Sequence, residues 1–300
     1  MKCSISVVVP TYNSSAFIDE TLRSCAQQTS QPDQVIVVDD ASVDDTCAKV
    51  VRLQRELPLS LSIIRLPKNS GGPSRPMNIG VSQSGCSHFT ILDHDDRLTV
   101  DAISTYRSMI NRIGIPTAAM VSADFLTFND RGILVHSHFQ KQAVLPPLLG
   151  TCSIGESVMF SSEECQRLLM HSWCLPTKAV FARDVWLQLG GFAERYRSAW
   201  DCDFVWRVAQ KYSIHVVNQV LSEIRIHPGS LASSDEVISP ELIDVYKRML
   251  GTARSREDRR LLLSRIRAEM FDLVYSSYKS RRWVKLACRG LQYLRFSLTY

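Results

Sequence analysis

The stretch Phe89–Val100, FTILDHDDRLTV, ends an apolar run with three aspartates in four positions. Side chains two residues apart in an extended chain point to the same face, so Asp93 and Asp95 lie together and Asp96 follows on the turn. Three unpaired carboxylates this close raise one another's pKa, and an oxygen-preferring cation such as Mg²⁺ or Mn²⁺ removes that cost. An N-cap for the following helix would need only one aspartate. The stretch therefore predicts a metal or ligand site at the end of a buried strand.

Three further apolar segments precede this one, and each is followed by a polar turn and a helical pattern. The four expected strands cover residues 5–10, 34–40, 61–66 and 88–93. Repeated alternation of strand and helix predicts an α/β fold with a central, mostly parallel mixed sheet flanked by helices. Ligands bind such sheets at the carboxyl ends of the strands. We therefore expect the four polar strand ends to meet at one crevice.

The turns after the first three strands offer candidate ligand contacts of different strength. Pro10–Asn13 contains residue types that are common in any turn. Asp39 and Asp40 could cap the next helix, or a carboxylate there could accept a ring N–H of a nucleobase. Gly71–Asn78 offers backbone N–H groups and Arg75, which suit a diphosphate. This loop is neither a GxGxxG nor a Walker sequence, so classical dinucleotide and ATP sites are not supported.

The second half of the chain, residues 116–238, has a less regular pattern. It contains two expected strands joined by a turn at 129–132, and later strands that alternate with short helices. Asp201 and Asp203 begin an amphipathic helix, where acidic residues also favour the helix dipole. His227 closes the last expected strand, and a single histidine is more often structural than a ligand. These residues alone leave the structural and functional interpretations open.

Composition places the chain among globular proteins. It has 300 residues, of which 45% are hydrophobic and 22% charged, and no apolar run reaches the roughly 18–20 residues that span a bilayer. The start, MKCSISVVVP, is too short an apolar segment for a signal peptide. Nine cysteines without CxxC spacing predict buried thiols in a reducing compartment rather than disulfides. We therefore expect a cytoplasmic location.

The net charge of +5 is unevenly distributed along the chain. Residues 240–300 hold 14 Lys or Arg and 6 Asp or Glu, whereas residues 1–239 hold 21 and 24. The basic segment predicts two or three helices with arginines between apolar positions. It could pack on the domain as a solvated face, or contact an anionic membrane peripherally, at the inner face. Nucleic acid is not expected, because aromatic residues are sparse among the cations and no such motif appears.

Seven segments, taken in order, identify a family resemblance. They are ISVVVPTYN, VIVVDDASVDDT, NSGGPSRPMNIG, ILDHDD, VFARDVWLQLGGF, WDCDFVWRVA and RIHPGS. Together they resemble the inverting nucleotide-sugar glycosyltransferases of family 2, which have the GT-A fold. The resemblance implies a GT-A domain at 1–238, with a nucleotide-binding half at 1–115 and an acceptor-binding half at 116–238. Residues 239–300 would form a basic helical appendage.

For the nucleotide, the resemblance implies contacts from all four strand ends. Asp40 would hold the base, usually uracil, and Asp93 would contact the ribose. The other positions expected at the nucleotide are Pro10, Thr11, Tyr12, Asn13, Gly72, Arg75 and Asn78. Members of the family commonly have an Arg-Asn pair in the third loop, where this chain has Met77 and Asn78. Arg75 is therefore expected to supply the cation.

For the chemistry, the resemblance implies Mn²⁺ or Mg²⁺ and a carboxylate base. Asp95, Asp96 and His227 would bind the metal, and Asp201 would be the catalytic base. Asp201 matches the second member of an acidic pair whose first member is replaced by Trp200, a departure that bears on acceptor contacts. The expected reaction moves a sugar from a UDP-sugar to a saccharide or lipid-linked saccharide, as in cell-surface polysaccharide synthesis.

Two alternatives remain open from the sequence. A nucleotidyltransferase would share the sheet and the carboxylate–metal chemistry, but its glycine-rich, cationic first loop is missing from PTYNSS. The second alternative is a non-catalytic protein that binds nucleotide sugars, and the departures from the family pattern at Trp200 and Met77 leave it open. Conversion of a donor to free nucleotide would separate this last alternative from the enzymes.

Overall fold

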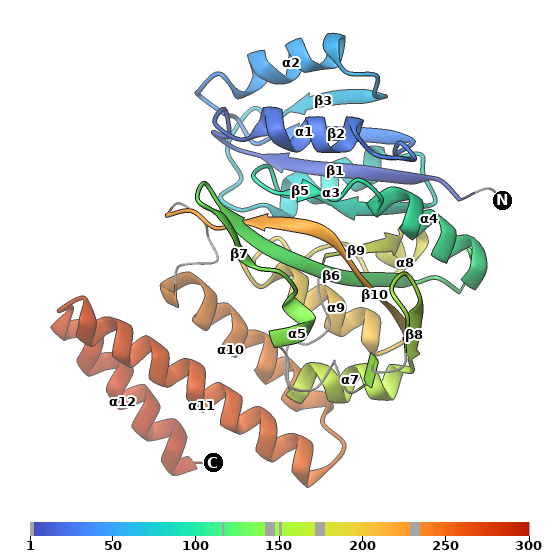
Figure 1. The fold of residues 1–300 in the computed structure, drawn as a ribbon. Helices are drawn as coiled ribbons and strands as arrows, with labels where there is room; N and C mark the ends of the chain where they lie inside the picture. The colour runs from blue at the N-terminus through green and yellow to red at the C-terminus, as the bar shows by residue number, and fades with distance from the viewer. Residues whose placement is uncertain are drawn as a thin grey trace.

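The computed structural model describes residues 3–115, 117–141, 148–149, 152–171, 178–228 and 235–299. These residues form a central sheet with helices on both faces and a helical arm at the carboxyl end of the chain (Figure 1). The sheet contains ten strands, and its main path has the order β3-β2-β1-β4-β9-β6-β10-β5. The mixed α/β class predicted from the sequence is confirmed.

The first half of the sheet is parallel, as predicted. It consists of β1 (Ile5–Thr11), β2 (Gln34–Asp39), β3 (Leu61–Arg65) and β4 (His88–Ile91). β1 pairs in parallel with both β2 and β4, and β2 pairs with β3. Every residue of β1 and β4 is buried, which explains why these strands read as continuous apolar runs.

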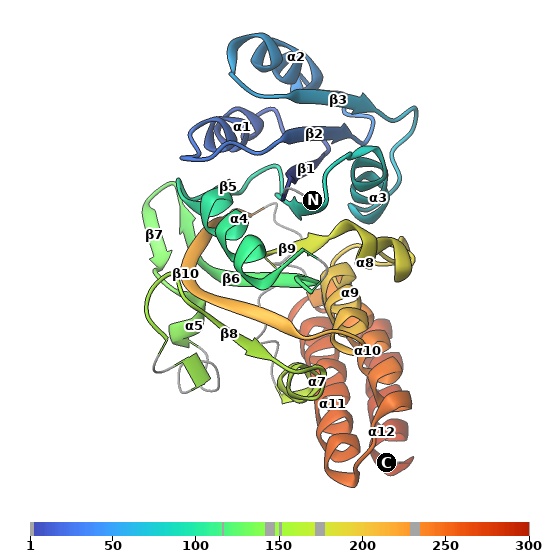
Figure 2. The same cartoon turned by 90° about the vertical axis from the view of Figure 1, so that its right-hand side faces the viewer.

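Helices cover the two faces of this half-sheet with separate hydrophobic cores. On one face lie α1 (Ile18–Ala26), α2 (Thr46–Glu56) and α4 (Ala102–Ile113). On the other face α3 (Ser74–Gln83) packs against β1 and β2 (Figure 2). A Cβ atom at Gly80 of α3 would lie 2.4 Å from Val8 of β1. Glycine is therefore required there for the helix to approach the sheet.

The second half of the sheet is mixed in direction. It consists of β5 (Arg97–Leu98), β6 (Met120–Asn129), β7 (Gly132–Val135), β8 (Ser157–Phe160), β9 (Ala179–Ala182) and β10 (Ile214–Arg225). β9 pairs antiparallel with both β4 and β6, and so joins the two halves. β6 and β10 are parallel, with register shifts after Val217 and Val220. The helices are α5 (His138–Lys141), α7 (Ser162–His171), α8 (Arg183–Gln188) and α9 (Trp200–Ala209).

Three helices follow the sheet: α10 (Asp235–Thr252), α11 (Arg256–Lys279) and α12 (Trp283–Thr299). α10 begins before Pro240 and runs through the predicted boundary at residue 239. Tyr246 of α10 and Ile266 of α11 are buried in the same core as α9, whereas α12 packs on α11. Within the described residues, none of the helices combines the length and hydropathy that a membrane span needs.

Candidate active site

The acidic turn after β4 is neutralised by a lysine from the second half of the chain. Lys178 Nζ donates to Asp93 Oδ2 at 2.6 Å and to Asp96 Oδ2 at 2.8 Å. Burial alone would raise the pKa of Asp93, but the Lys178 ammonium outweighs it and holds that pKa below its usual value. For Asp96, burial prevails over the lysine, and the neighbouring carboxylates add to it, so that its pKa rises to about 7. The premise of three unpaired carboxylates is therefore wrong.

Arg225, the last residue of β10, fixes the backbone and one carboxylate of the same turn. Its N–H donates to Asp96 Oδ1 at 2.9 Å, and its Nε donates to the carbonyl oxygen of Asp95 at 3.2 Å. The guanidinium also pairs with Glu20 and lies 4.5 Å from the ring centroid of Phe128. Both carboxylate oxygens of Asp96 are thus engaged, by Lys178 and by Arg225.

Asp95 and His227 lie together, as the resemblance implies for a metal pair. His227 Nε2 lies 2.9 Å from Asp95 Oδ2, and both side chains are partly accessible. The histidine ring packs 4.9 Å from the ring of Phe17. Among the described residues there is no group of three or more potential His, Cys, Asp or Glu ligands. Mg²⁺ commonly uses one or two carboxylates together with phosphate oxygens, so this pair fits such a cation once a diphosphate is bound.

Asp40, the predicted base-binding residue, is oriented by the loop after β3. Its two carboxylate oxygens accept from Ser70 N at 2.9 and 3.0 Å, and Ser70 Oγ donates to Oδ2 at 2.8 Å. A carboxylate has about four acceptor positions, so capacity remains for a ligand N–H. The preceding Asp39 is fully buried and accepts from Ser42 N at 3.1 Å. Asp39 therefore caps the turn, and Asp40 faces the loop.

The turn after β1 lies between Asp40 and Asp93. Asp40 N donates to Thr11 O at 2.8 Å. β1 is flanked by β2 and β4, so the strands that carry the two aspartates are two strand spacings, about 10 Å, apart. Thr11 hydroxyl bonds to Ser14, and Asn13 adopts φ 50° with its Oδ1 accepting from Val43 N. Pro10 is buried in β1, while Tyr12 is 44% exposed. Tyr12 is thus the side chain of this turn best placed to meet a ligand.

The loop before α3, together with α3 itself, contacts the segment that precedes α9. Ser74 Oγ donates to Tyr196 O at 3.0 Å, and a Cβ at Gly72 would lie 3.3 Å from Arg197. Asn78 Nδ2 donates to Phe192 O at 2.9 Å and its Oδ1 accepts from Phe192 N at 2.8 Å. The side-chain amide of Asn78 is thus hydrogen-bonded to the backbone of Phe192 through both its oxygen and its nitrogen. Arg75, in contrast, is exposed.

Asp201 lies in the first turn of α9, whose start is fixed by Glu241 of α10. The Glu241 carboxylate accepts backbone N–H bonds from residues 197, 198 and 199 at 2.8, 2.8 and 2.9 Å. Asp201 Oδ1 accepts from the N–H of Cys202 at 2.7 Å. Asp203 instead pairs with Arg207 at 2.8 Å and is buried. Of the two aspartates, Asp203 is therefore structural, and Asp201 stays the candidate base.

Three residues that hold the site were not singled out from the sequence: Lys178, Arg225 and Glu241. Lys178 directly precedes the all-buried strand β9, and Arg225 ends β10 with only 7% exposure. For both residues, the sequence offered one signal of such a role: a basic residue next to an apolar strand, in a domain with more acidic than basic residues. Glu241 gave no such signal, because its role depends on the packing of α10 on α9.

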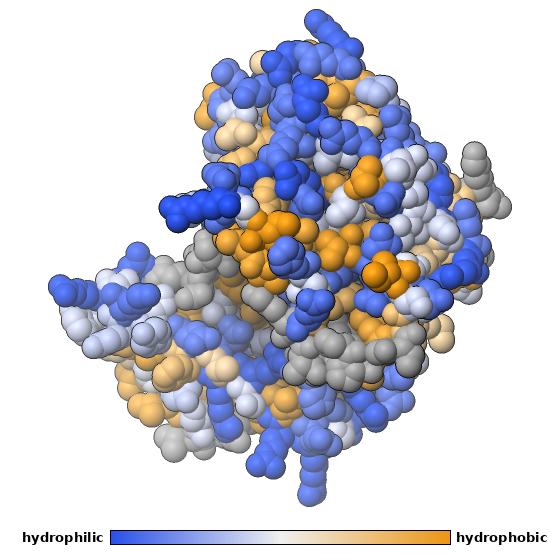
Figure 3. Space-filling view, viewed as in Figure 1, coloured by the Kyte–Doolittle hydropathy of each residue, from blue (hydrophilic) through white to orange (hydrophobic). Residues whose placement is uncertain are grey.

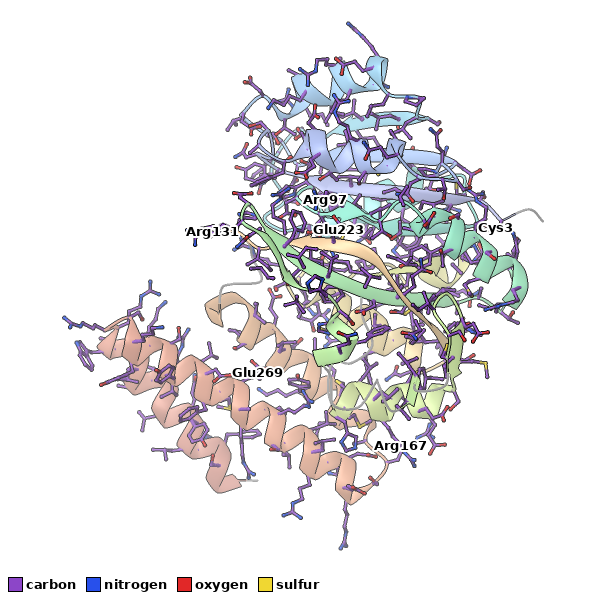
Figure 4. The ribbon with its side chains drawn as sticks, in the orientation of Figure 1. Cys3, Arg97, Arg131, Arg167, Glu223 and Glu269 are labelled. Atoms are coloured by element: carbon purple, nitrogen blue, oxygen red, sulfur yellow. The ribbon has the colours of Figure 1, made fainter. Side chains whose placement is uncertain are left out.

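A cavity of about 410 Å³ opens beside Arg225, at the carboxyl ends of β6 and β10. Its lining includes Glu20, Arg97 and Asp130. Figure 4 shows Arg97 and Glu223 close together at this part of the sheet, and their side chains form an ion pair at 2.6 Å. The charged groups of the cavity are thus balanced within the protein.

The glycosyl transferase family 2 model matches residues 6–161. Among curated relatives, the poly(ribitol-phosphate) beta-N-acetylglucosaminyltransferase TarS of Staphylococcus aureus is 36% identical over 108 residues, which are 35% of this chain and 18% of TarS. The GalNAc(5)-diNAcBac-PP-undecaprenol beta-1,3-glucosyltransferase of Campylobacter jejuni is 32% identical over 107 residues, which are 36% of this chain and 34% of that protein. The matched part of this chain thus spans about a third or less of either relative.

A solved structure shows how far the fold is shared. The crystal structure of S. aureus TarS residues 1–349 in complex with UDP-GlcNAc has a TM-score of 0.69 at 20% identity, covering 98% of this chain and 81% of that chain. This likeness supports the GT-A type of fold. Because the family model covers more than half of its residues, the chain belongs to glycosyl transferase family 2, a family of sugar-transferring enzymes.

Proposed function

We propose that this protein transfers a sugar from a nucleotide diphosphate donor, a UDP-sugar, to a hydroxyl of a saccharide or lipid-linked saccharide. The main support is the arrangement of the strand ends: β1, β2 and β4 lie side by side. Asp40 and Asp93 follow two of these strands; the loop before α3 bonds to Asp40, and the first residue of α3 bonds to the segment that precedes α9. Donor and base would therefore share one edge of the sheet.

The donor would lie across the ends of these strands. Asp40 would accept a ring N–H of the base, Asp93 would contact the ribose, and Gly72 with Arg75 would face the diphosphate. The solved TarS complex with UDP-GlcNAc supports uracil as the base through its shared fold. The names of two relatives specify a poly(ribitol-phosphate) and an undecaprenol-linked saccharide, which supports a polymer or lipid-linked acceptor in cell-surface polysaccharide synthesis.

We propose Asp95 and His227 as the protein ligands of a Mn²⁺ or Mg²⁺ ion. Such an ion, when bound, stabilises the negative charge that grows on the departing diphosphate. The approach of Asp95 Oδ2 to His227 Nε2 at 2.9 Å supports this assignment. Asp96 would join as a ligand only after its bond to Lys178 opened.

The transfer would be a single displacement. The Asp201 carboxylate takes the proton from the acceptor hydroxyl while that oxygen attacks the anomeric carbon. The bond from the anomeric carbon to the diphosphate oxygen breaks, and the diphosphate leaves with the electron pair. One displacement inverts the anomeric configuration and needs no protein nucleophile.

A panel of UDP-, GDP- and dTDP-sugars, each with Mn²⁺, tests the proposal. We expect a UDP-sugar to raise the melting temperature, and to be converted to free UDP when an acceptor is present. Thermal stabilisation without turnover would favour a non-catalytic binding protein. Release of pyrophosphate from a nucleoside triphosphate would favour a nucleotidyltransferase, and no response to any nucleotide sugar would contradict the donor assignment.

A further inference from the structure

The hairpin of α11 and α12 carries large apolar side chains on its outside. Six of them form what we call the arm surface: Tyr275, Tyr278, Trp283, Val284, Leu291 and Leu294. Their exposed fractions run from 57% for Tyr275 and Leu294 to 80% for Val284. The Trp283 ring lies 6.4 Å from the Tyr278 ring, so the two helices share this surface at the tip of the hairpin.

The two sides of α12 explain why this exposure is unusual. The inner side packs on α11 through partly buried residues such as Leu286, Tyr293 and Phe296. Val284, Leu291 and Leu294 recur at helical spacing on the outer side, where a surface helix normally presents polar residues. α12 is therefore apolar on two sides, and only one of them is covered within the described residues.

The same segment is strongly cationic. Residues 273–300 contain six Lys or Arg and no Asp or Glu. Four of these cations, at positions 279, 281, 282 and 285, flank Trp283 in the sequence near the turn between α11 and α12. A second copy of the chain would bring two such segments together, and like charges repel. An anionic partner complements both the charge and the exposed apolar groups.

The tip of the arm lies on the same side of the molecule as the candidate active site (Figure 1). The turn between α11 and α12 and the carboxyl ends of β1, β6 and β10 lie on the same side of the molecule (Figure 1). Figure 3 shows hydrophilic residues at the tip of this arm and more apolar ones along it. A flat surface that touches the tip would therefore lie on the same side of the molecule as these strand ends (Figure 1).

We propose that the arm surface docks on an anionic lipid bilayer, with Trp283, Val284 and Leu291 in the headgroup region and the cations at lipid phosphates. Trp and Tyr favour membrane interfaces, and basic helices with an apolar face lie in the plane of the bilayer. The proposal does not rest on the donor assignment, since it concerns a surface outside the strand ends.

Vesicle binding by the full 300-residue chain provides the test. Phosphatidylcholine vesicles, with and without phosphatidylglycerol, are sedimented with wild type and with two variants. Trp283→Glu/Leu291→Glu removes the apolar contact at exposed positions, and Lys279→Gln/Arg281→Gln removes two cations. The matched control, Val100→Glu/Lys211→Gln, makes the same kinds of change at exposed positions outside the arm.

We expect wild type and control to bind the anionic vesicles only, and the apolar variant to lose binding. Removal of each cation should weaken binding about fivefold at low salt. Equal binding to neutral vesicles, or unchanged binding by the apolar variant, would overturn the proposal. The proposal would also be overturned if the wild type did not bind vesicles but formed a dimer, and if Trp283→Glu/Leu291→Glu dissociated that dimer. An unchanged melting temperature in every variant would show that the fold is intact, and this measurement does not depend on the donor assignment.

Discussion

The acidic turn after β4 and the start of α9 both present aspartates, but they are held in different ways. At the turn, the carboxylates themselves are held by the Lys178 ammonium, the backbone N–H of Arg225 and the His227 ring. At α9, the backbone is held by Glu241, and Asp201 accepts a bond from the neighbouring N–H of Cys202. The candidate binding residues at the turn are therefore themselves part of a buried charge network, whereas the position of the candidate base Asp201 depends on a different residue.

This difference predicts which substitutions lower the rate of transfer without lowering the free energy of unfolding, and which lower the free energy of unfolding as well. A change at the turn leaves an opposite charge buried without its partner, which costs free energy in the folded state. A change of Asp201 to its amide keeps the shape and leaves the Glu241 bonds in place. The two regions should therefore respond differently when transfer rate, donor affinity and free energy of unfolding are each measured.

The largest effect is expected for Asp201→Asn. An amide cannot take the proton of the acceptor hydroxyl, so the transfer rate should fall by about 10²- to 10⁴-fold. Donor affinity by calorimetry and the melting temperature should stay near those of wild type. Asp203→Asn is the matched comparison: it weakens the buried pair with Arg207 and should lower stability. Near-wild-type turnover by Asp201→Asn would disprove its assignment as the base.

Lys178→Met is expected to cost about 3 kcal/mol of unfolding free energy, because it leaves Asp93 and Asp96 without their shared ammonium. Urea unfolding measures the change. The double variant Lys178→Met/Asp96→Asn removes the more buried carboxylate as well, and should recover part of the loss. If the single variant were as stable as wild type, Lys178 would not hold the turn.

Asp95→Ala tests the binding role of the same turn. We expect it to weaken Mn²⁺-dependent donor affinity about 10- to 100-fold, with a smaller effect when the metal is chelated. Isothermal titration calorimetry with and without EDTA separates the two conditions. The isosteric Asp95→Asn variant keeps the shape of the side chain and should fall in between. Unchanged affinity in both variants would remove Asp95 from the metal site.

The fold was more predictable from the sequence than the site. The strands at residues 5–10 and 34–40 are buried on both faces, so their apolar runs are unambiguous, and the ligand edge follows from parallel topology. The pairing of Asp95 with His227 was anticipated only through the family resemblance. Lys178 and Arg225 reach the turn from strands far along the chain. Such contacts depend on the order of β9 and β10 in the sheet, which hydrophobic periodicity does not encode.

The smallest effect is expected at Glu241, which supports Asp201 from outside the strand ends. Glu241→Gln replaces a carboxylate that accepts three backbone N–H bonds by an amide whose NH₂ group cannot accept any. The loss should be about 1 kcal/mol in stability, measured by thermal unfolding. Because the start of α9 would loosen, kcat should fall severalfold while the KM for the donor stays constant. Glu163→Gln, in an exposed pair with Arg167, is the matched control and should change neither. A fall in stability without a change in kcat would mean that Glu241 holds α10 to the core but does not position Asp201.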